Sequence, residues 1–159
     1  MIRRLDGPDW ALLRDVRLRA LRADPDAFAS ALHVEAAHPD EHWRAEVAAG
    51  VWFLSHPLGL AHGTLDGSDA VLSAMWVSPT ARGHGVGVSL VGAVVDWATA
   101  EGADRLLARV FDDAPHARAL YGGAGFVPEP TARASRWHPP RTWRTWALPL
   151  PVVGTAPES

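Results

Sequence analysis

Residues 70–102 of the chain read AVLSAMWVSPTARGHGVGVSLVGAVVDWATAEG. The apolar run at the start of this stretch predicts a strand, Ala70–Val77, which ends at Ser78-Pro79. The apolar residues after the glycines recur at helical spacing on nearly every side, so they predict a deeply buried helix up to Glu101. Strand and helix are joined by a glycine-rich turn, Arg82-Gly83-His84-Gly85-Val86-Gly87.

This glycine-rich turn has the chemistry of an anion site. A helix N-terminus leaves amide donors unpaired and carries about half a positive charge, and glycines ahead of it let the backbone approach a phosphate closely. We therefore predict a phosphate cradle of backbone N–H groups, with one guanidinium as an added cation. The residues expected to contact the anion are Arg82, Gly83, His84, Gly85, Val86, Gly87, Val88 and Ser89.

Two other interpretations compete for the same turn. A dinucleotide-binding turn needs the pattern G-x-G-x-x-G/A, whose third position falls on Val88 or Leu90 when counted from Gly83 or Gly85. Neither residue fits that pattern. The second alternative is a tight strand–helix connection that needs glycine for its shape alone, and the turn by itself does not exclude it.

Upstream of this stretch, two more apolar runs predict strands, at Val51–Leu54 and Leu58–Leu65, with His56-Pro57 between them. The hairpin sequence Asp66-Gly67-Ser68-Asp69 joins the second run to the strand at 70–77, so the three strands predict an antiparallel meander. The chain before them predicts a short strand at 1–5 and three helices. The helices are expected from the start signal Asp6-Gly7-Pro8 to residue 23, over Ala27–Ala36, and from Pro39-Asp40 to about residue 49.

Downstream, Arg105–Val110 predicts a buried strand, Pro115–Gly122 a short helix, and Phe126-Val127 the start of another strand. Residues 128–140 are expected to be irregular, and Thr142–Leu148 forms the final strand. The strand–helix–strand crossover from about 70 to 110 makes this a mixed α/β fold. We expect one domain over residues 1–150 and a polar tail at 151–159.

Composition excludes several classes of function. The net charge of −3 argues against a general nucleic-acid binder. No apolar run is long enough to predict a membrane span, and the N-terminus lacks the apolar region of a signal peptide. The chain has no cysteine and no lysine, which excludes thiolate zinc sites, a cysteine nucleophile and Schiff-base chemistry. The eight histidines show no paired metal-ligand spacing, so we expect no metal. Asparagine and glutamine are also absent, as in proteins of very GC-rich genomes, and we expect a bacterial, cytoplasmic protein.

Two motifs of the sequence, the glycine-rich turn and a later segment at residues 110–126, together match one known superfamily. The turn fits the pattern R/Q-x-x-G-x-G/A of the GNAT superfamily of acetyl-CoA-dependent N-acetyltransferases. Residues 110–126, VFDDAPHARALYGGAGF, resemble that superfamily's segment V-x-x-x-N-x-x-A-x-x-L-Y-x-x-x-G-F. The resemblance spans about Ile2 to Leu150. It implies the GNAT fold, a mostly antiparallel central sheet with one parallel, splayed pair of strands at the cofactor site, flanked by helices.

The resemblance also implies how acetyl-CoA binds. The cosubstrate would lie between the strand that ends at Val77 and the strand that ends near Val110, with its pyrophosphate on the turn. The backbone of Val77 would pair with the pantetheine arm like an added strand. Ala114 and Ala117 match cofactor-binding positions, but relatives carry asparagine where this chain has Ala114. The role of that asparagine must be lost here or taken by a backbone group or water.

The acetyl transfer to an amine that the resemblance implies needs a general acid for the leaving sulfur and a route by which the amine loses its proton. Tyr121, the single tyrosine, matches the superfamily's general acid, which protonates the leaving thiolate and also contacts the cofactor. Many relatives place a glutamate on the strand before the turn, but residues 71–77 carry no acid. Glu35 is the best remaining carboxylate for the base, His33 and His62 are further candidates, and a water relay to the backbone is our default.

The predicted function is acetyl transfer from acetyl-CoA to a primary amine by direct attack, on a small amine, an antibiotic-like amine or a peptide N-terminus. The alternatives are a non-catalytic acyl-CoA-binding module of the same fold and a nicotinamide-dependent oxidoreductase. Trp137, Trp143 and Trp146 cluster near the end of the sequence. We interpret them as core or homodimer packing, with an aromatic acceptor pocket as the alternative.

Overall fold

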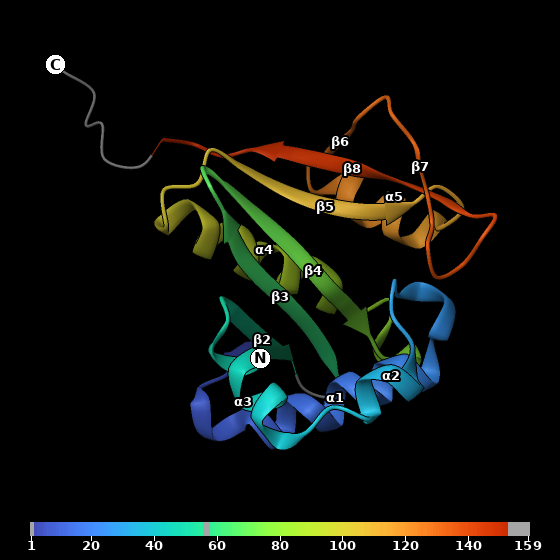
Figure 1. Cartoon of the computed structure of the whole chain (residues 1–159). Helices are drawn as coiled ribbons and strands as arrows, with labels where there is room; N and C mark the ends of the chain where they lie inside the picture. The colour runs from blue at the N-terminus through green and yellow to red at the C-terminus, as the bar shows by residue number, and fades with distance from the viewer. Residues whose placement is uncertain (1, 56–57, 153–159) are drawn as a thin grey trace, which may run out of the picture.

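The computed structural model describes residues 2–55 and 58–152. Figure 1 shows one twisted sheet with helices on both faces. The strands are β1 Ile2–Arg4, β2 Val51–Ser55, β3 Gly59–Asp66, β4 Asp69–Val77, β5 Arg105–Phe111, β6 Val127–Pro128, β7 Arg133–Ala134 and β8 Thr142–Pro149. The predicted connection at His56-Pro57 and most of the predicted tail lie outside the described residues.

The sheet has the order β1-β2-β3-β4-β5-β8-β6, and β7 also pairs with β8. In the described part of the chain, β4 and β5 run parallel and the other strand pairs run antiparallel. The meander β2-β3-β4 and the crossover from β4 to β5 are both as predicted. The predicted fold class, a mixed sheet with one parallel pair, is therefore confirmed.

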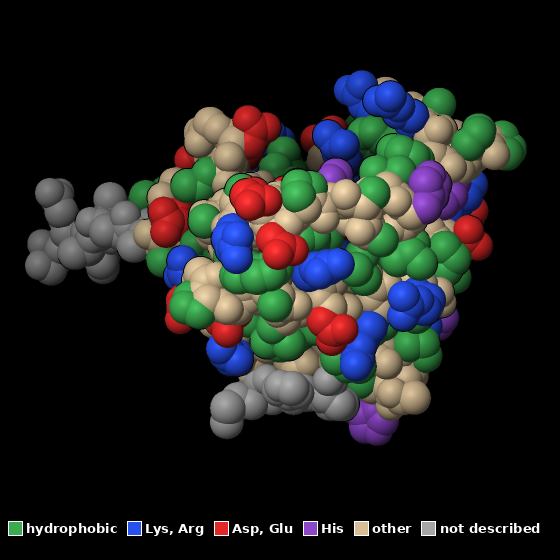
Figure 2. Space-filling view, turned by 60° about the horizontal axis from the view of Figure 1, so that its bottom comes forward, with side chains coloured by type: hydrophobic (Ala, Val, Ile, Leu, Met, Phe, Trp, Pro, Cys, Tyr) green, Lys and Arg blue, Asp and Glu red, His purple; other side chains and the backbone are tan. Residues whose placement is uncertain are grey.

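Five helices cover this sheet in the described residues: α1 Trp10–Ala23, α2 Leu32–Ala36, α3 Asp40–Ala48, α4 Val86–Ala100 and α5 Pro115–Gly123. Each face has its own core. Helix α4 packs its apolar residues, with Leu90 and Val94 fully buried, on one face. Helices α1 and α3 pack on the other around Leu13, Trp43 and Trp52. Over the face turned forward in Figure 2, arginine and acidic side chains are interspersed. None of the helices in the described ranges has the length and apolar character needed to cross a membrane.

The predicted helix Ala27–Ala36 is wrong in its first half. A 3-10 turn occupies residues 25–27, Phe28 is extended with φ −120° and ψ 149°, and the helix begins only at Leu32. The reason lies far away in the sequence, because the main-chain carbonyl of Phe28 accepts a hydrogen bond from His138 at 2.6 Å. A helix would have used that carbonyl internally, so a tertiary contact overrides the local pattern.

Strands β4 and β5 separate part of the way along their length. Their pairing covers Asp69–Leu72 against Arg105–Ala108, but β4 continues to Val77 and β5 to Phe111. Figure 1 shows the two strands side by side at one end and apart at the other. This divergence is the predicted splay.

A bulge in β4 lies beside the splay. His62 pairs with Ser73 and Leu60 with Trp76, so two residues of β4 oppose one of β3, and Ala74 takes a left-handed φ of 53°. The extra residue switches the faces of the strand. Leu72 belongs to the core against α4, whereas Trp76, four residues later, belongs to the core against α1 and α3.

Candidate functional site

A cavity of about 1380 Å³ occupies the gap between β4 and β5. The glycine-rich turn and the start of α5 border it on one side, and the segment 23–30 with α2 and α3 on the other. Small-ligand pockets are typically about 300–1,000 Å³, so this cavity has room for two ligands at once.

The backbone of the glycine-rich turn opens onto this cavity. Gly83 and Gly85 have φ of 80° and 77°, the left-handed region that favours glycine, and a side chain on either would project into open space. Gly87 has a different role, because a Cβ there would lie 3.4 Å from Leu120 Cδ1. The first two glycines thus give the turn its shape, whereas at Gly87 a side chain would meet Leu120 at ordinary contact distance.

The amide groups of the turn have the predicted character over most of its length. Within the described residues, no hydrogen bond joins the N–H groups of residues 84–88 to a protein acceptor. The N–H of Ser89 differs, because it donates to the Gly85 carbonyl at 3.0 Å. His84 and Ser89 also lie outside the cavity lining, while Gly83, Gly85, Val86, Gly87 and Val88 border it. The free donors that face the cavity are therefore a shorter set than the sequence predicts.

Arg82 ties the turn to the rest of the fold. Its Nε donates to the Val77 carbonyl at 3.1 Å, and its Nη2 donates to Asp24 Oδ2 at 2.9 Å. The same carboxylate oxygen accepts from Trp76 Nε1 at 2.7 Å. These bonds use the Nε donor and one Nη2 donor of Arg82, so the guanidinium anchors the turn and keeps its remaining N–H groups for the anion contact that the sequence predicts.

The backbone of Val77 faces the gap. The next residue, Ser78, donates its N–H to the Leu58 carbonyl at 2.9 Å. Because backbone groups alternate along a strand, the N–H and C=O of Val77 point to the other edge, toward β5. Arg82 already occupies that carbonyl, and the N–H is the group left for the predicted pairing with an extended ligand.

Tyr121 lies on α5 with 5% of its surface exposed, and it borders the cavity. Its ring packs edge-on against Phe126, with centroids 5.3 Å apart. Burial raises the pKa of Tyr121 well above its usual value, so the hydroxyl keeps its proton. A group in this state can donate a proton and cannot serve as a base. Ala114 and Ala117 border the same end of the cavity.

Glu35 lies in the cavity wall, but both of its carboxylate oxygens are engaged. Arg17 donates to them from Nε at 2.8 Å and from Nη2 at 2.9 Å, and its guanidinium lies 4.7 Å from the centre of the Phe28 ring. Burial acts to raise the pKa of Glu35, yet the hydrogen bonds and charge of Arg17 together lower it. A paired carboxylate of lowered pKa is a weak base, so this geometry does not favour the role predicted for Glu35.

His62 borders the cavity, whereas His33 is exposed on α2 and is not among the residues that line it. The Nε2 of His62 lies 2.7 Å from the Ala49 carbonyl, and its Nδ1 lies 3.3 Å from Ser73 Oγ. The ring stacks on Trp52 at 3.8 Å. Burial lowers the pKa of His62, while the Ala49 carbonyl and the charge of Glu46 act in the opposite direction.

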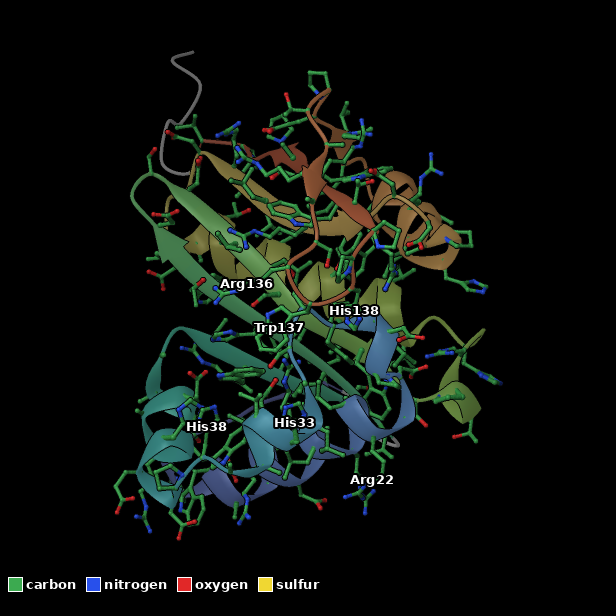
Figure 3. All side chains as sticks on the ribbon, turned by 45° about the vertical axis from the view of Figure 1, so that its right-hand side comes forward. Arg22, His33, His38, Arg136, Trp137 and His138 are labelled. Atoms are coloured by element: carbon green, nitrogen blue, oxygen red, sulfur yellow. The ribbon has the colours of Figure 1, made fainter. Side chains whose placement is uncertain are left out.

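The C-terminal loop, residues 135–141, lies beside the cavity on the side away from the turn, and its Arg141 borders the cavity. His138 reaches the Phe28 carbonyl, and Arg141 donates to the Asp26 carbonyl and to both oxygens of Asp113 at 2.8–3.0 Å. Figure 3 shows Arg136, Trp137 and His138 on this loop, which extends toward the helix that carries His33. The loop thus joins the C-terminal half of the sheet to the segment before α2.

The three C-terminal tryptophans do not form one cluster. Trp146 is buried in the core, Trp143 borders the cavity beneath the guanidinium of Arg109, and Trp137 is 44% exposed. Trp143 therefore lies in the cavity wall, the place that the alternative interpretation, an aromatic acceptor pocket, requires. The sequence did not single out Ser73, Arg17 or Arg141 as site residues. Ser73 had a visible signal, since it is a polar residue in an apolar strand.

The family model described as Acetyltransferase (GNAT) family matches residues 13–126. Mycothiol acetyltransferase of Beutenbergia cavernae is 35% identical over 92 residues, which is 48% of this chain and 30% of that protein. The chain thus matches less than a third of that relative's length.

Two solved structures are similar in fold. A GNAT-family acetyltransferase from Streptococcus pneumoniae gives a TM-score of 0.81 at 18% identity and covers 95% of this chain and 99% of that one. A putative acetyltransferase from Salmonella typhimurium, solved with its cofactor acetyl-CoA, gives 0.70 at 19% identity and covers 100% and 98%. At these identities the likeness concerns the fold alone.

Proposed function

Because the chain belongs to the GNAT acetyltransferase family, we propose that it transfers the acetyl group of acetyl-CoA to a primary amine. One observation carries this proposal, the row of unpaired N–H groups at residues 84–88 beside a cavity between two diverging strands. A diphosphate suits such a row, because it offers several anionic oxygens to donors at the positive end of a helix. The family model also argues against the nicotinamide-dependent alternative.

The chain's own residues suggest how the cosubstrate is held. The N–H groups of Gly85, Val86, Gly87 and Val88 would bind the pyrophosphate, and the Val77 N–H would pair with the pantetheine arm. Tyr121 borders the same cavity from α5. This arrangement would bring the thioester into the part of the cavity that lies between β4 and β5.

The reaction breaks one C–S bond and forms one C–N bond. The amine nitrogen attacks the thioester carbonyl carbon, and the sulfur leaves with the bonding electrons. A free thiol has a pKa of about 8.5, so protonation of the leaving sulfur helps at neutral pH. Tyr121 is suited to give that proton, because burial keeps its hydroxyl protonated. The amine must in turn lose a proton to the protein or to water.

The acceptor half of the cavity mixes aromatic and polar side chains. Trp52, Trp143 and Phe28 offer apolar surface, while Arg109 and Glu46 add charge. The C-terminal loop is bonded across this side of the cavity. A recessed space of this kind suits a small amine, an antibiotic-like amine or a free peptide N-terminus better than the flat surface of a folded protein.

A thiol-release assay tests this function. The protein is incubated with acetyl-CoA and a panel of amines comprising ethylamine, benzylamine, glucosamine and a dipeptide, and free CoA is followed. We expect amine-dependent thiol release. The alternative function, a non-catalytic acyl-CoA-binding module, has its own support in Ala114, which replaces the family's asparagine, and in the paired state of Glu35. It predicts CoA binding in a titration without thiol release from any amine.

A further inference from the structure

We propose that Ser73 and His62 form a proton relay that takes the proton of the acceptor amine during acetyl transfer, an inference that rests on the proposed function. The two residues face each other across β3 and β4. Ser73 would contact the amine, and His62 would receive the proton through it. No sequence motif points to this pair, which only the strand register brings together.

The hydrogen bonds fix which nitrogen of His62 is free. A carbonyl oxygen can only accept, so the contact of 2.7 Å between Nε2 and the Ala49 carbonyl requires a proton on Nε2. In the neutral ring, Nδ1 then carries a lone pair, and Ser73 Oγ at 3.3 Å must donate to it. The hydroxyl of Ser73 therefore points its proton toward His62 and leaves its own lone pairs free.

Ser73 has the right position to meet an acceptor. It follows Leu72, the last residue of β4 that pairs with β5, so it is the first residue past the point where the strands separate. Its side chain is exposed and borders the cavity, whereas His62 behind it is only 8% exposed. The bulge at Ala74 follows at once, which places Ser73 at the bend of the strand.

The surroundings of His62 act on its charge in both directions: burial lowers its pKa and keeps the resting ring neutral, while the Ala49 carbonyl and Glu46 stabilise the proton when the ring takes one up. Trp52 stacks on the ring at 3.8 Å, and Trp52 itself is held by a hydrogen bond from Nε1 to the Glu46 carbonyl at 2.7 Å. From α3, the carboxylate of Glu46 favours the imidazolium, and from α1 the charge of Arg17 opposes it. Glu35 on α2 neutralises Arg17 through their ion pair.

The transfer balances in atoms and charge. Ser73 Oγ accepts one proton from the ammonium form of the acceptor and passes its own proton to Nδ1 of His62, which becomes an imidazolium with protons on both nitrogens. The neutral amine then attacks the thioester, and the second proton that its nitrogen loses as the amide forms balances the proton that Tyr121 gives to the leaving sulfur. Ser73 is left as a neutral hydroxyl. The imidazolium returns its proton to water after the amide product leaves. No oxidant, metal or further reactant is needed.

The test uses the panel amine that releases thiol fastest, with acetyl-CoA at saturation, from pH 6 to pH 10. We expect His62→Gln and Ser73→Ala to lower kcat/KM for the amine about 10²-fold at pH 7. The loss should shrink as the pH rises toward the pKa of the chosen amine, because more of the amine is then neutral without help, and it should level off above that pKa. Ser73→Thr keeps the hydroxyl and should stay within about threefold of the parent protein. His33→Gln, an exposed histidine outside the cavity, is the matched control and should match the parent.

The outcomes separate the relay from the function itself. A loss that stays constant across the pH range would show that the pair only shapes the site, and the relay would be overturned while acetyl transfer stands. Full activity of Ser73→Ala would overturn it in the same way. If the parent protein releases no thiol with any amine, the proposed function fails, and the relay fails with it.

A second measurement does not depend on turnover. Nitrogen-15 chemical shifts of the histidine side chains in the whole protein report the tautomer of His62. We expect the neutral ring at pH 7 with its proton on Nε2, in the parent and in Ser73→Ala. A proton on Nδ1 would overturn the relay, because Ser73 could not then donate to that nitrogen.

Discussion

Arg17 and Glu35 form a two-pronged ion pair in the cavity wall, although 18 residues separate them in the sequence. Both side chains are largely buried, with 13% and 12% of their surface exposed. One guanidinium nitrogen of Arg17, Nη1, is buried with no partner among the described residues. The carboxylate therefore compensates a buried charge, and that function differs from the base role that the sequence predicted for it.

Glu35→Gln is expected to change stability more than turnover. Loss of the carboxylate leaves Arg17 buried without a counter-charge, which should lower the free energy of unfolding by about 2 kcal/mol at pH 7. Turnover should stay within about threefold of the parent, since a general base would contribute about 10²-fold or more. Urea unfolding measures the change in stability, and the thiol-release assay measures the change in turnover. A large loss of turnover in a variant of unchanged stability would show that Glu35 is the general base.

The same pair gives stability a pH dependence. The pKa of Glu35 is lowered in the folded protein from an ordinary value of 4.5. Its contribution is therefore fully present above about pH 4.5 and is lost as the pH falls through the folded pKa. The difference in unfolding free energy between the parent and Glu35→Gln should narrow in acid, which urea titrations at pH 7 and pH 3.5 would measure. A difference that does not change with pH would contradict the assignment of this effect to Glu35.

Tyr121→Phe tests whether Tyr121 is the general acid that protonates the leaving sulfur. The variant keeps the ring that packs on Phe126 and removes the hydroxyl alone. We expect kcat to fall about 10²-fold, with the KM for acetyl-CoA nearly unchanged, because the proton is needed only as the sulfur leaves. Initial rates over a range of acetyl-CoA concentrations separate the two constants. Turnover equal to the parent from pH 6 to pH 9 would show that Tyr121 only packs.

Gly85→Val tests the phosphate cradle. The left-handed backbone at this residue disfavours a β-branched side chain, and the new atoms would project into the space beside the free N–H groups. We expect the KM for acetyl-CoA to rise about tenfold or more, the equivalent of one lost charge-assisted hydrogen bond. Gly67→Val is the matched control, since Gly67 has φ of 61°, open space around it and a place in the hairpin away from the cavity. An equal rise in KM in both variants would point to a loss of fold instead.

The longer strands and the long helix α4 were predictable from the sequence because their signals are local, whereas β7 at Arg133–Ala134 falls in the stretch expected to be irregular, where only its pairing with β8 makes it a strand. Alternating apolar runs, a two-residue hairpin and glycines before a buried helix each depend on neighbouring residues. The splay at the cofactor site came from the resemblance to the superfamily and not from such a pattern. The prediction of a helix over residues 27–31 failed because the Phe28 carbonyl accepts a hydrogen bond from His138, 110 residues away in the sequence.

The candidate site was predictable on its cofactor side and much less so on its acceptor side. Gly85 and Tyr121 belong to short motifs, so their place beside the cavity could be anticipated. His62 and Ser73 lie 11 residues apart and meet only through the register of β3 and β4. The pairing of Arg17 with Glu35 likewise depends on how α2 packs, which no periodicity reveals.

Arg141→Ala tests whether the C-terminal loop shapes the acceptor side. Arg141 binds Asp113, donates to the Asp26 carbonyl and lies 3.7 Å from the centre of the Phe111 ring. Its removal would break these contacts and leave the His138–Phe28 hydrogen bond as the link to the segment before α2. We expect the KM for the amine to rise about tenfold, while the KM for acetyl-CoA, bound on the far side, changes less than twofold. Arg136→Ala, an exposed arginine on the same loop, is the control for loss of charge alone. If Arg141→Ala raised both constants equally, the loop would support the whole cavity and not the acceptor in particular.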